Sequence, residues 1–256
     1  MGTTFGLNSK DLNLTVNRLG VVNDSLRLYY DAGIKASYPG SGATWYDLSG
    51  NGTHCTLYGS GGVTYSANYA TEPEWVNLGE PPSFRFDGSN DFGKYTQFTI
   101  GSACTISVWF KTSATSGTKG LMSHCSGGPV SVSYDITNGN PRYYYYSSGW
   151  QTWTASASVA TGVWKNVVWS KSGTSMSLYV DGAFSQSTTL VADVGGNMAC
   201  IGSTWGPCNS DSYGAGTDTY STVFNGNIGA VMVHTKQLNA TEVLQNYNVL
   251  KNRYRA

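Results

Sequence analysis

Aromatic side chains gather in one short stretch of this sequence, and rings of this kind can recognise sugars. Four consecutive tyrosines occupy positions 143–146, and two tryptophans follow closely. In a strand, successive side chains point to opposite faces, so one set of rings would enter the core while the other set stays open. A flat ring packs on the C–H face of a sugar, and neighbouring polar groups bond its hydroxyls. The candidates for such contacts are Tyr144, Tyr146, Trp150 and Trp153.

A second aromatic and polar stretch lies further along the chain. Trp205, Asn209, Asp211 and Tyr213 belong to a segment rich in Gly, Ser and Asn, which is typical of a long loop at the edge of a sandwich. Tyr and Trp are also enriched in cores and in interfaces between subunits. For both stretches the sequence therefore leaves two interpretations, glycan contact on one hand and core packing or subunit contact on the other.

The carboxylates do not follow the pattern that sugar hydrolysis needs. Retaining glycosidases hold two carboxyl groups about 5–5.5 Å apart across the substrate. Glu72 and Glu74 flank Pro73, and proline disfavours the regular strand that would put both on one face. Glu80 and Glu242 belong to no paired motif. The sequence therefore predicts no catalytic residue and a protein that is not an enzyme.

Two kinds of residue in the sequence are candidates for metal ligands. The two His-Cys pairs, His54-Cys55 and His124-Cys125, are poor zinc sites because neighbouring residues of a strand point to opposite faces. Oxygen ligands that suit calcium are more plentiful in the later loop. Asp211 and Asp218 are the calcium candidates, and no other cofactor is predicted.

The five cysteines are an odd number, which argues against a complete disulfide framework. Cys200 and Cys208 could close the loop between them with a disulfide bond. In a reducing compartment all five thiols would instead stay free. The sequence leaves this pairing open.

Short apolar segments separated by turn residues run through most of the chain and predict the scaffold for these side chains. Residues 164–182 show the pattern best, with apolar and polar residues alternating on both sides of a turn at 171–175 and a further turn at Asp181-Gly182. Many short strands at this spacing predict one all-β sandwich. The other predicted strands lie near residues 26–30, 83–88, 103–111, 121–124, 130–134, 142–146, 150–154, 198–202 and 227–233.

One helix is predicted near the C-terminus. Apolar residues recur at helical spacing from Val243 to Tyr254. Asn239 followed three residues later by Glu242 forms a capping box, and Leu238 with Val243 forms a hydrophobic staple. The helix should lie against the sandwich and close it.

Charge is scarce and balanced, which excludes several classes of partner. Only 12% of the 256 residues are charged, with 15 basic and 15 acidic side chains, whereas an ordinary soluble domain carries about 25%. Without a positive surface the sequence predicts no nucleic-acid partner. No apolar run is long enough to enter and span a membrane, and residues 1–11 lack the pattern of a signal peptide.

Six motifs follow one another along the chain. They are 26–32 together with 45–52, then 84–91, 105–110, 164–182, and 224–233 with the closing helix. This series resembles the laminin-G-like branch of the concanavalin A-like lectin/glucanase superfamily over residues 26–254. The resemblance implies two large antiparallel sheets packed face to face in a jelly roll, with one C-terminal helix.

The opening at 31–52 and the ending at 245–254 are similar to single-domain versions that tailed bacteriophages encode as head-decoration, fibre or other virion proteins. This resemblance implies a non-enzymatic structural protein on the virion surface, assembled in the host cytoplasm, that displays a lectin-like domain able to contact glycans. The alternative is a lectin or adhesin whose main task is sugar recognition.

Two parts of the chain are predicted. Residues 1–25 are interpreted as an N-terminal arm, because Asn and Asp interrupt their apolar residues, and residues 26–256 form a single sandwich domain. The expected partners are other virion proteins, reached through the arm, further copies of the chain in a homo-oligomer, and cell-surface glycans.

Overall fold

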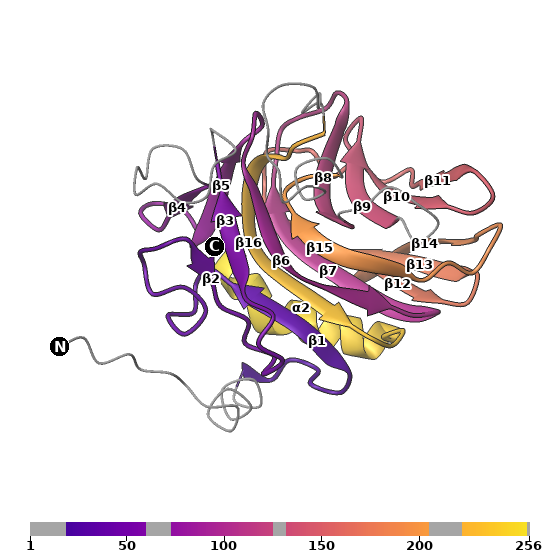
Figure 1. Ribbon diagram of the computed structural model, residues 1–256, viewed down its shortest axis with the longest axis horizontal. Coiled ribbons are helices and arrows are strands. Elements are labelled where there is room, and N and C mark those ends of the chain that lie inside the picture. The colour runs from indigo at the N-terminus through magenta and orange to yellow at the C-terminus, as the bar shows by residue number, and fades with distance from the viewer. Residues whose placement is uncertain (1–18, 60–72, 125–131, 205–221, 255–256) are drawn as a thin grey trace.

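The computed structural model describes residues 19–59, 73–124, 132–204 and 222–254. In these residues two antiparallel sheets lie face to face, and a single long helix covers the outer face of one of them (Figure 1). The structure therefore confirms the predicted all-β sandwich with a C-terminal helix.

The first sheet has eight strands, and one of them, β1 (Leu26–Asp31), pairs beside the main path with β16. The main path runs through β14 (Ala183–Thr189), β13 (Ser175–Val180), β12 (Lys165–Ser172), β7 (Ala103–Lys111), β16 (Asn225–His234), β5 (Ser83–Asp87) and β4 (Glu74–Val76).

The second sheet also has eight strands. Its order is β11 (Trp150–Thr154), β10 (Asn140–Tyr146), β9 (Val132–Thr137), β8 (Thr118–Ser123), β15 (Gly196–Ile201), β6 (Phe92–Ile100), β3 (Cys55–Tyr58) and β2 (Thr44–Trp45). The tyrosine-rich segment is thus the last hairpin of this sheet, at the end where β14 closes the other sheet (Figure 1).

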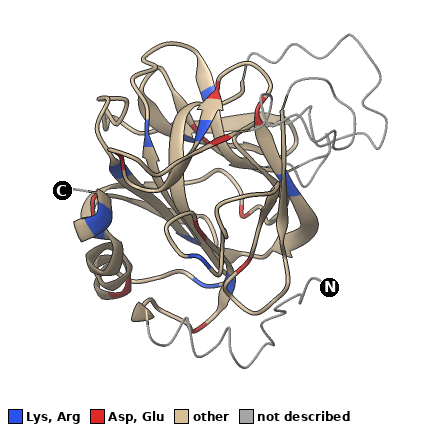
Figure 2. Ribbon diagram, turned by 90° about the vertical axis from the view of Figure 1, so that its left-hand side faces the viewer, with Lys and Arg blue, Asp and Glu red and all other residues tan. Residues whose placement is uncertain are grey.

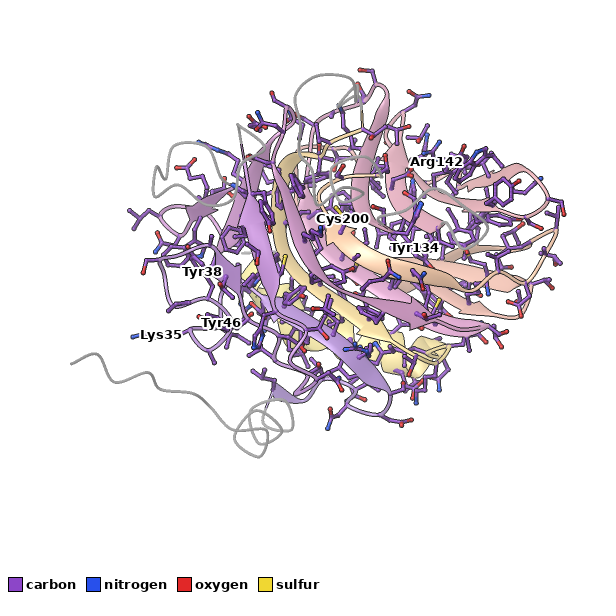
Figure 3. All side chains as sticks on the ribbon, viewed as in Figure 1. Lys35, Tyr38, Tyr46, Tyr134, Arg142 and Cys200 are labelled. Carbon is purple, nitrogen blue, oxygen red and sulfur yellow. The ribbon has the colours of Figure 1, made fainter. Side chains whose placement is uncertain are left out.

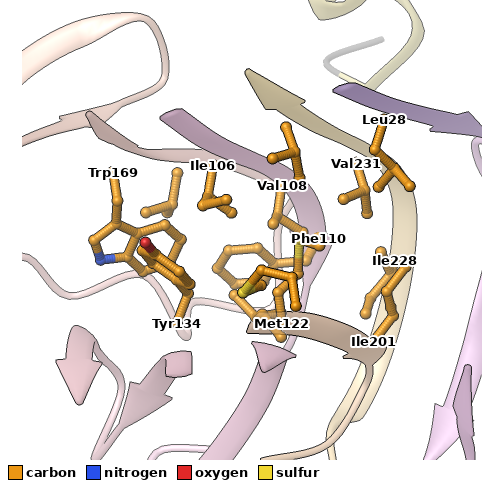
Figure 4. Packing of buried hydrophobic residues seen from close by; sticks show 14 of the residues in the cluster. Leu28, Ile106, Val108, Phe110, Met122, Tyr134, Trp169, Ile201, Ile228 and Val231 are labelled. Carbon is orange, nitrogen blue, oxygen red and sulfur yellow. The ribbon is translucent and has the colours of Figure 1, made fainter. Parts of the chain in front are cut away.

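Large apolar side chains from both sheets fill the space between them (Figure 4). Trp169 of β12 meets Tyr134 of β9 edge to face, with ring centroids 5.7 Å apart. Phe110 of β7 and Met122 of β8 lie in the same layer. The period-two alternation in the sequence follows from this geometry, because every second side chain of a strand points into the layer.

The hairpin between β13 and β14 turns through Asp181 and Gly182, as predicted. Both residues have positive φ angles, 54° and 78°, which is the backbone of a type I′ turn. The preceding turn is shorter than predicted, because β12 extends to Ser172 and only Gly173 and Thr174 connect it to β13. Lys171 lies in the strand, where its buried ammonium donates to Asp193 at 2.6 Å.

The helix α2 (Ala240–Tyr254) begins with the predicted capping box. The Asn239 N–H donates to the Glu242 carboxylate at 2.9 Å, and the Glu242 N–H donates to the Asn239 side chain at 3.0 Å. Tyr247 and Tyr254 stack on Trp109 with centroids 5.4 and 4.7 Å away. Trp109 therefore packs under the helix and not between the two sheets.

The end of the predicted arm packs on the domain. Val21 and Val22 are buried, and the Val22 N–H donates to the Asn246 side chain of α2 at 2.7 Å. On the other side, Nε2 of His234 in β16 lies 2.9 Å from the Val22 carbonyl oxygen. These contacts fix residues 21 and 22 to both the helix and the sheet.

Burial of His234 makes the stability of the domain depend on pH. Burial lowers the pKa of His234 to about 4, so the folded chain keeps it neutral while an unfolded chain takes up a proton below about pH 6.5. The contribution of neutral His234 to the free energy of unfolding is fully present above pH 6.5 and is lost as the pH falls towards 4. We expect a loss of about 3 kcal/mol.

The measurement is urea unfolding near neutral pH and near pH 4.5, compared with His234→Gln, whose amide can still donate to Val22 but does not titrate. The variant should lose less stability on acidification than the wild type. An identical loss in both proteins would contradict the assignment to His234.

Charged residues are spread thinly over the described part of the chain, with both signs mixed (Figure 2). Such a distribution creates no extended field of one sign that would steer a polyanion. None of the helices in the described ranges is long and apolar enough to cross a membrane.

Candidate functional site

The hairpin β10–β11 places the predicted rings by its register. Tyr144 faces Thr152, and Tyr146 faces Trp150. Around Ser147–Gly149 the chain reverses, and the Ser147 N–H donates to the Gly149 carbonyl at 2.8 Å. Burial alternates strictly along β10, so the even-numbered tyrosines lie on the outer face and the odd-numbered ones on the core face, as the sequence predicts.

Three rings form a contiguous group on the outer face, which we call the hairpin ring cluster: Tyr144, Tyr146 and Trp150. Tyr144 and Trp150 stack with centroids 4.7 Å apart and planes 5° from parallel. Tyr146 meets Trp150 nearly perpendicularly, with centroids 5.3 Å apart. Trp150 is the most open of the three, with 39% of the residue exposed.

An ion pair between β10 and the neighbouring strand β9 supports the hairpin ring cluster. Arg142 donates from Nε and Nη2 to the two carboxylate oxygens of Asp135, at 2.7 and 2.8 Å, and its guanidinium lies 4.8 Å from the centroid of the Tyr144 ring. Along the hairpin, Arg142 and Trp150 lie on opposite sides of Tyr144. Tyr144 therefore lies between Arg142 and Trp150 along the hairpin, and Trp150 is the most exposed ring of the cluster.

The carboxylate at the base of this stack is fully buried. Burial raises the pKa of Asp135, and the Arg142 guanidinium and the Ser133 hydroxyl oppose that shift. The Ser133 hydroxyl donates to the carboxylate at 2.9 Å. A bidentate pair of this kind fixes the plane of the guanidinium. It therefore also fixes the position of the Tyr144 ring, which packs on the guanidinium. Arg142 is labelled beside β10 in Figure 3.

Trp153 does not join the hairpin ring cluster. It faces Tyr143 across the hairpin, which is the core face, and it packs against the hydrophobic core as a partly buried residue. Of the four rings predicted in this stretch, the structure brings Tyr144, Tyr146 and Trp150 together and separates Trp153 from them.

The remaining predicted site residues lie outside the described part of the chain. They are Trp205, Asn209, Asp211 and Tyr213 of the later loop and the calcium candidates Asp211 and Asp218. Within the described ranges, no group of three or more His, Cys, Asp or Glu side chains could hold a metal ion.

The described glutamates are engaged in separate ion pairs. Glu74 pairs with Arg85, and Glu80 accepts from Lys111 at 2.7 Å. Glu242 accepts from Lys236 at 2.8 Å and also belongs to the helix cap. Glu72, on the other side of Pro73 from Glu74, lies outside the described residues.

The cysteines fall into two groups in the structure. Cys55 and Cys104 are free and buried, and burial raises the pKa of both thiols. Cys200 is disulfide-bonded, and its partner lies outside the described residues. The pairing of Cys200 with Cys208 stays a prediction.

Sequence reasoning missed Asp135 and Arg142 as part of this site. Arg142 precedes Tyr144 by two residues and therefore shares its face. That spacing was readable in the sequence. The buried position of Asp135 was not, because it depends on the pairing of β9 with β10, in which Arg142 faces Asp135.

Comparisons with known proteins agree with this fold. A family model described as the concanavalin A-like lectin/glucanases superfamily matches residues 87–244, whereas no curated protein matches the chain. Domain 4 of AbnA, a GH43 extracellular arabinanase from Geobacillus stearothermophilus, was solved in complex with arabinotriose. It is similar with a TM-score of 0.63 and 15% identity, over 87% of this chain and 98% of that one.

Two botulinum neurotoxin structures have similar folds. The domain of serotype D/C has a TM-score of 0.61 at 14% identity, over 89% of this chain and 53% of that one. The structure of the type C toxin, whose cell entry depends on interaction with two ganglioside molecules, has a TM-score of 0.58 at 13% identity, over 90% of this chain and 52% of that one. This chain thus spans about half the length of each of these two toxin chains, and at such identities the similarity is one of fold.

Proposed function

Because this chain belongs to the concanavalin A-like lectin/glucanases superfamily, we propose that it is a non-enzymatic glycan-binding protein. We place the sugar contact at the tip of the β10–β11 hairpin, on the open surface of Trp150 and Tyr146. The observation that carries this proposal is the hairpin ring cluster. In it Trp150 is 39% exposed, and its indole packs against the rings of Tyr144 and Tyr146.

The support beneath the rings favours binding. Arg142 is fixed by the buried Asp135 carboxylate and packs on Tyr144, and Tyr144 in turn stacks on Trp150. A ring that is already ordered loses little conformational entropy when a ligand packs on it. A sugar would lay its C–H face against the indole, and the hydroxyl groups of the neighbouring Tyr144 and Tyr146 would be partners for its hydroxyl groups.

The relatives by fold are consistent with this class of ligand. Domain 4 of AbnA was solved with arabinotriose bound, and the type C toxin interacts with gangliosides. The carboxylates add a separate argument for a role without catalysis. Glu74, Glu80 and Glu242 each have a cationic or backbone partner in a different part of the fold.

We predict that Trp150→Ala weakens glycan binding by about 10–100-fold, because the substitution removes the ring on which the sugar would pack. The full chain is first applied to a glycan array, and the best oligosaccharide is then titrated by calorimetry. The matched control is Tyr46→Ala, since Tyr46 is 40% exposed and lies on the opposite side of the molecule from Arg142 (Figure 3).

Equal binding by the wild type and Trp150→Ala would contradict this location for the site. So would a loss of binding in Tyr46→Ala alone. No binding to any glycan on the array would contradict the proposed function itself.

A second candidate function is display of this domain on a phage particle. It rests on the similarity of residues 31–52 and 245–254 to phage virion proteins, and it assigns residues 1–25 to attachment and residues 26–256 to the displayed domain. The chain would then be assembled in the host cytoplasm and remain on the virion surface, where glycan contact serves adsorption. Antibody labelling of purified particles in the electron microscope tests this role, and particles that carry no label would overturn it.

A further inference from the structure

The two ends of the sandwich differ in how their edge strands are protected. At one end the last strands are short, two residues in β2 and three in β4, and Glu74 of β4 carries a charge paired with Arg85. At the other end β11 has five residues and β14 has seven. Short length and charge are the usual devices that prevent strand edges from pairing with another chain. The first end has both of them.

The edge strand β11 lacks these devices. The whole stretch 143–163 contains no Asp, Glu, Lys, Arg or Pro. Its pairing with β10 has no bulge, whereas the edge strand of the other sheet, β14, is interrupted by one. Among the described strands none pairs with the outer side of β11.

The hydrogen-bond phase of the hairpin identifies the groups on that outer side. Ser147 bonds to Gly149, and the Ala155 N–H donates to the Pro141 carbonyl at 2.8 Å. Bonded and non-bonded pairs alternate along an antiparallel ladder. Gln151 and Trp153 therefore direct their main-chain groups towards β10, while Thr152 and Thr154 direct theirs away from the sheet.

We propose that β11 pairs antiparallel with β11 of a second copy of this chain. With Trp153 at the centre, Thr152 of each copy faces Thr154 of the other, and the outward N–H and C=O groups of these residues form four hydrogen bonds. In a two-fold dimer the same edge of each copy meets the other, so charged residues there would face like charges. The edge of β11 is uncharged and can therefore pair with itself. The two eight-stranded sheets would continue as one sheet across the dimer.

An exposed apolar side chain lies near β10, the strand next to this edge. Val191 is 72% exposed, and its N–H is fixed to the hydroxyl oxygen of Tyr145 in β10 at 3.2 Å. The two-fold axis also puts both hairpin ring clusters on the same face of the continuous sheet. The dimer does not depend on glycan binding, but it would make such binding bivalent.

The test is sedimentation velocity on the full chain, over concentrations from low micromolar to near millimolar, for the wild type and two proline variants. Thr152→Pro removes one outward N–H of β11 from each copy and leaves the bonds to β10 intact. Thr189→Pro is the matched control. The Leu190 N–H donates to the Thr174 carbonyl within the hairpin, so the main-chain N–H of Thr189 is on the outer side of β14, away from β13.

We expect a dimer in the wild type, a dissociation constant raised at least about tenfold in Thr152→Pro, and no change in Thr189→Pro. If Thr152→Pro fails to fold, hydrogen exchange on the wild type decides, since the Thr152 and Thr154 amides should become protected as concentration rises. A wild type that stays monomeric at all concentrations would overturn the proposal. So would a dimer that Thr152→Pro leaves unchanged, or one that only Thr189→Pro disrupts.

Discussion

Replacing Trp169 by alanine is expected to lower the free energy of unfolding by about 3–5 kcal/mol. Trp169 is fully buried between the sheets and packs on Tyr134 (Figure 4). Its strand β12 lies between β7 and β13, so hydrogen bonds on both sides prevent the backbone from moving to fill the cavity. The loss combines the transfer energy of the indole with the cost of that cavity.

Chemical unfolding monitored by circular dichroism measures this loss. Trp169→Phe is the control, because it keeps an aromatic ring in the same layer and should lose clearly less than the alanine variant. A loss below about 1 kcal/mol in Trp169→Ala would mean that this layer is not a packed core.

The second large effect is expected from Asp31→Ala, which should cost about 3–5 kcal/mol because it removes a fully buried carboxylate and leaves a partly buried cation without its partner. Asp31 is fully buried at the end of β1 and accepts from Arg253 of α2 and, at 2.9 Å, from the Tyr29 hydroxyl. Burial lowers the pKa of Arg253, but the Asp31 carboxylate more than reverses this and holds it above its ordinary value. The pair therefore joins the end of the helix to the first strand.

A double-mutant cycle separates the pair from its surroundings. Asp31→Ala combined with Arg253→Met should cost less than the sum of the two single changes, since neither partner is then left unpaired. The control is Glu80→Ala, which removes an ion pair between partly exposed side chains and should cost less than about 1 kcal/mol. Additive effects of Asp31 and Arg253 would contradict a coupled pair.

The sequence predicted those parts of the fold that depend on local periodicity. The alternation in 143–146 separates core-facing from outward-facing tyrosines without any knowledge of the partner strands. The capping box at Asn239 and Glu242 is likewise a local signal, and the structure contains both of its hydrogen bonds. Features with a period of two or 3.6 residues can be read from one segment alone.

Other features depend on pairing between segments and could not be read in this way. Trp153 faces the core because the turn at 147–149 places it opposite Tyr143, and a hairpin one residue longer would reverse that face. Val22 is buried through contacts with Asn246 and His234, which are more than two hundred residues away in the chain. The Asp135–Arg142 pair depends in the same way on the register of β9.

The central claim, that a sugar packs on Trp150 at the hairpin tip, is tested most directly by NMR of the indole N–H groups during titration with the best oligosaccharide from the array. Trp150→Phe identifies the Trp150 signal by its absence. The claim predicts a saturable shift of that signal, while the signals of the buried Trp45 and Trp169 stay in place. Saturable binding that leaves the Trp150 signal unmoved would contradict it.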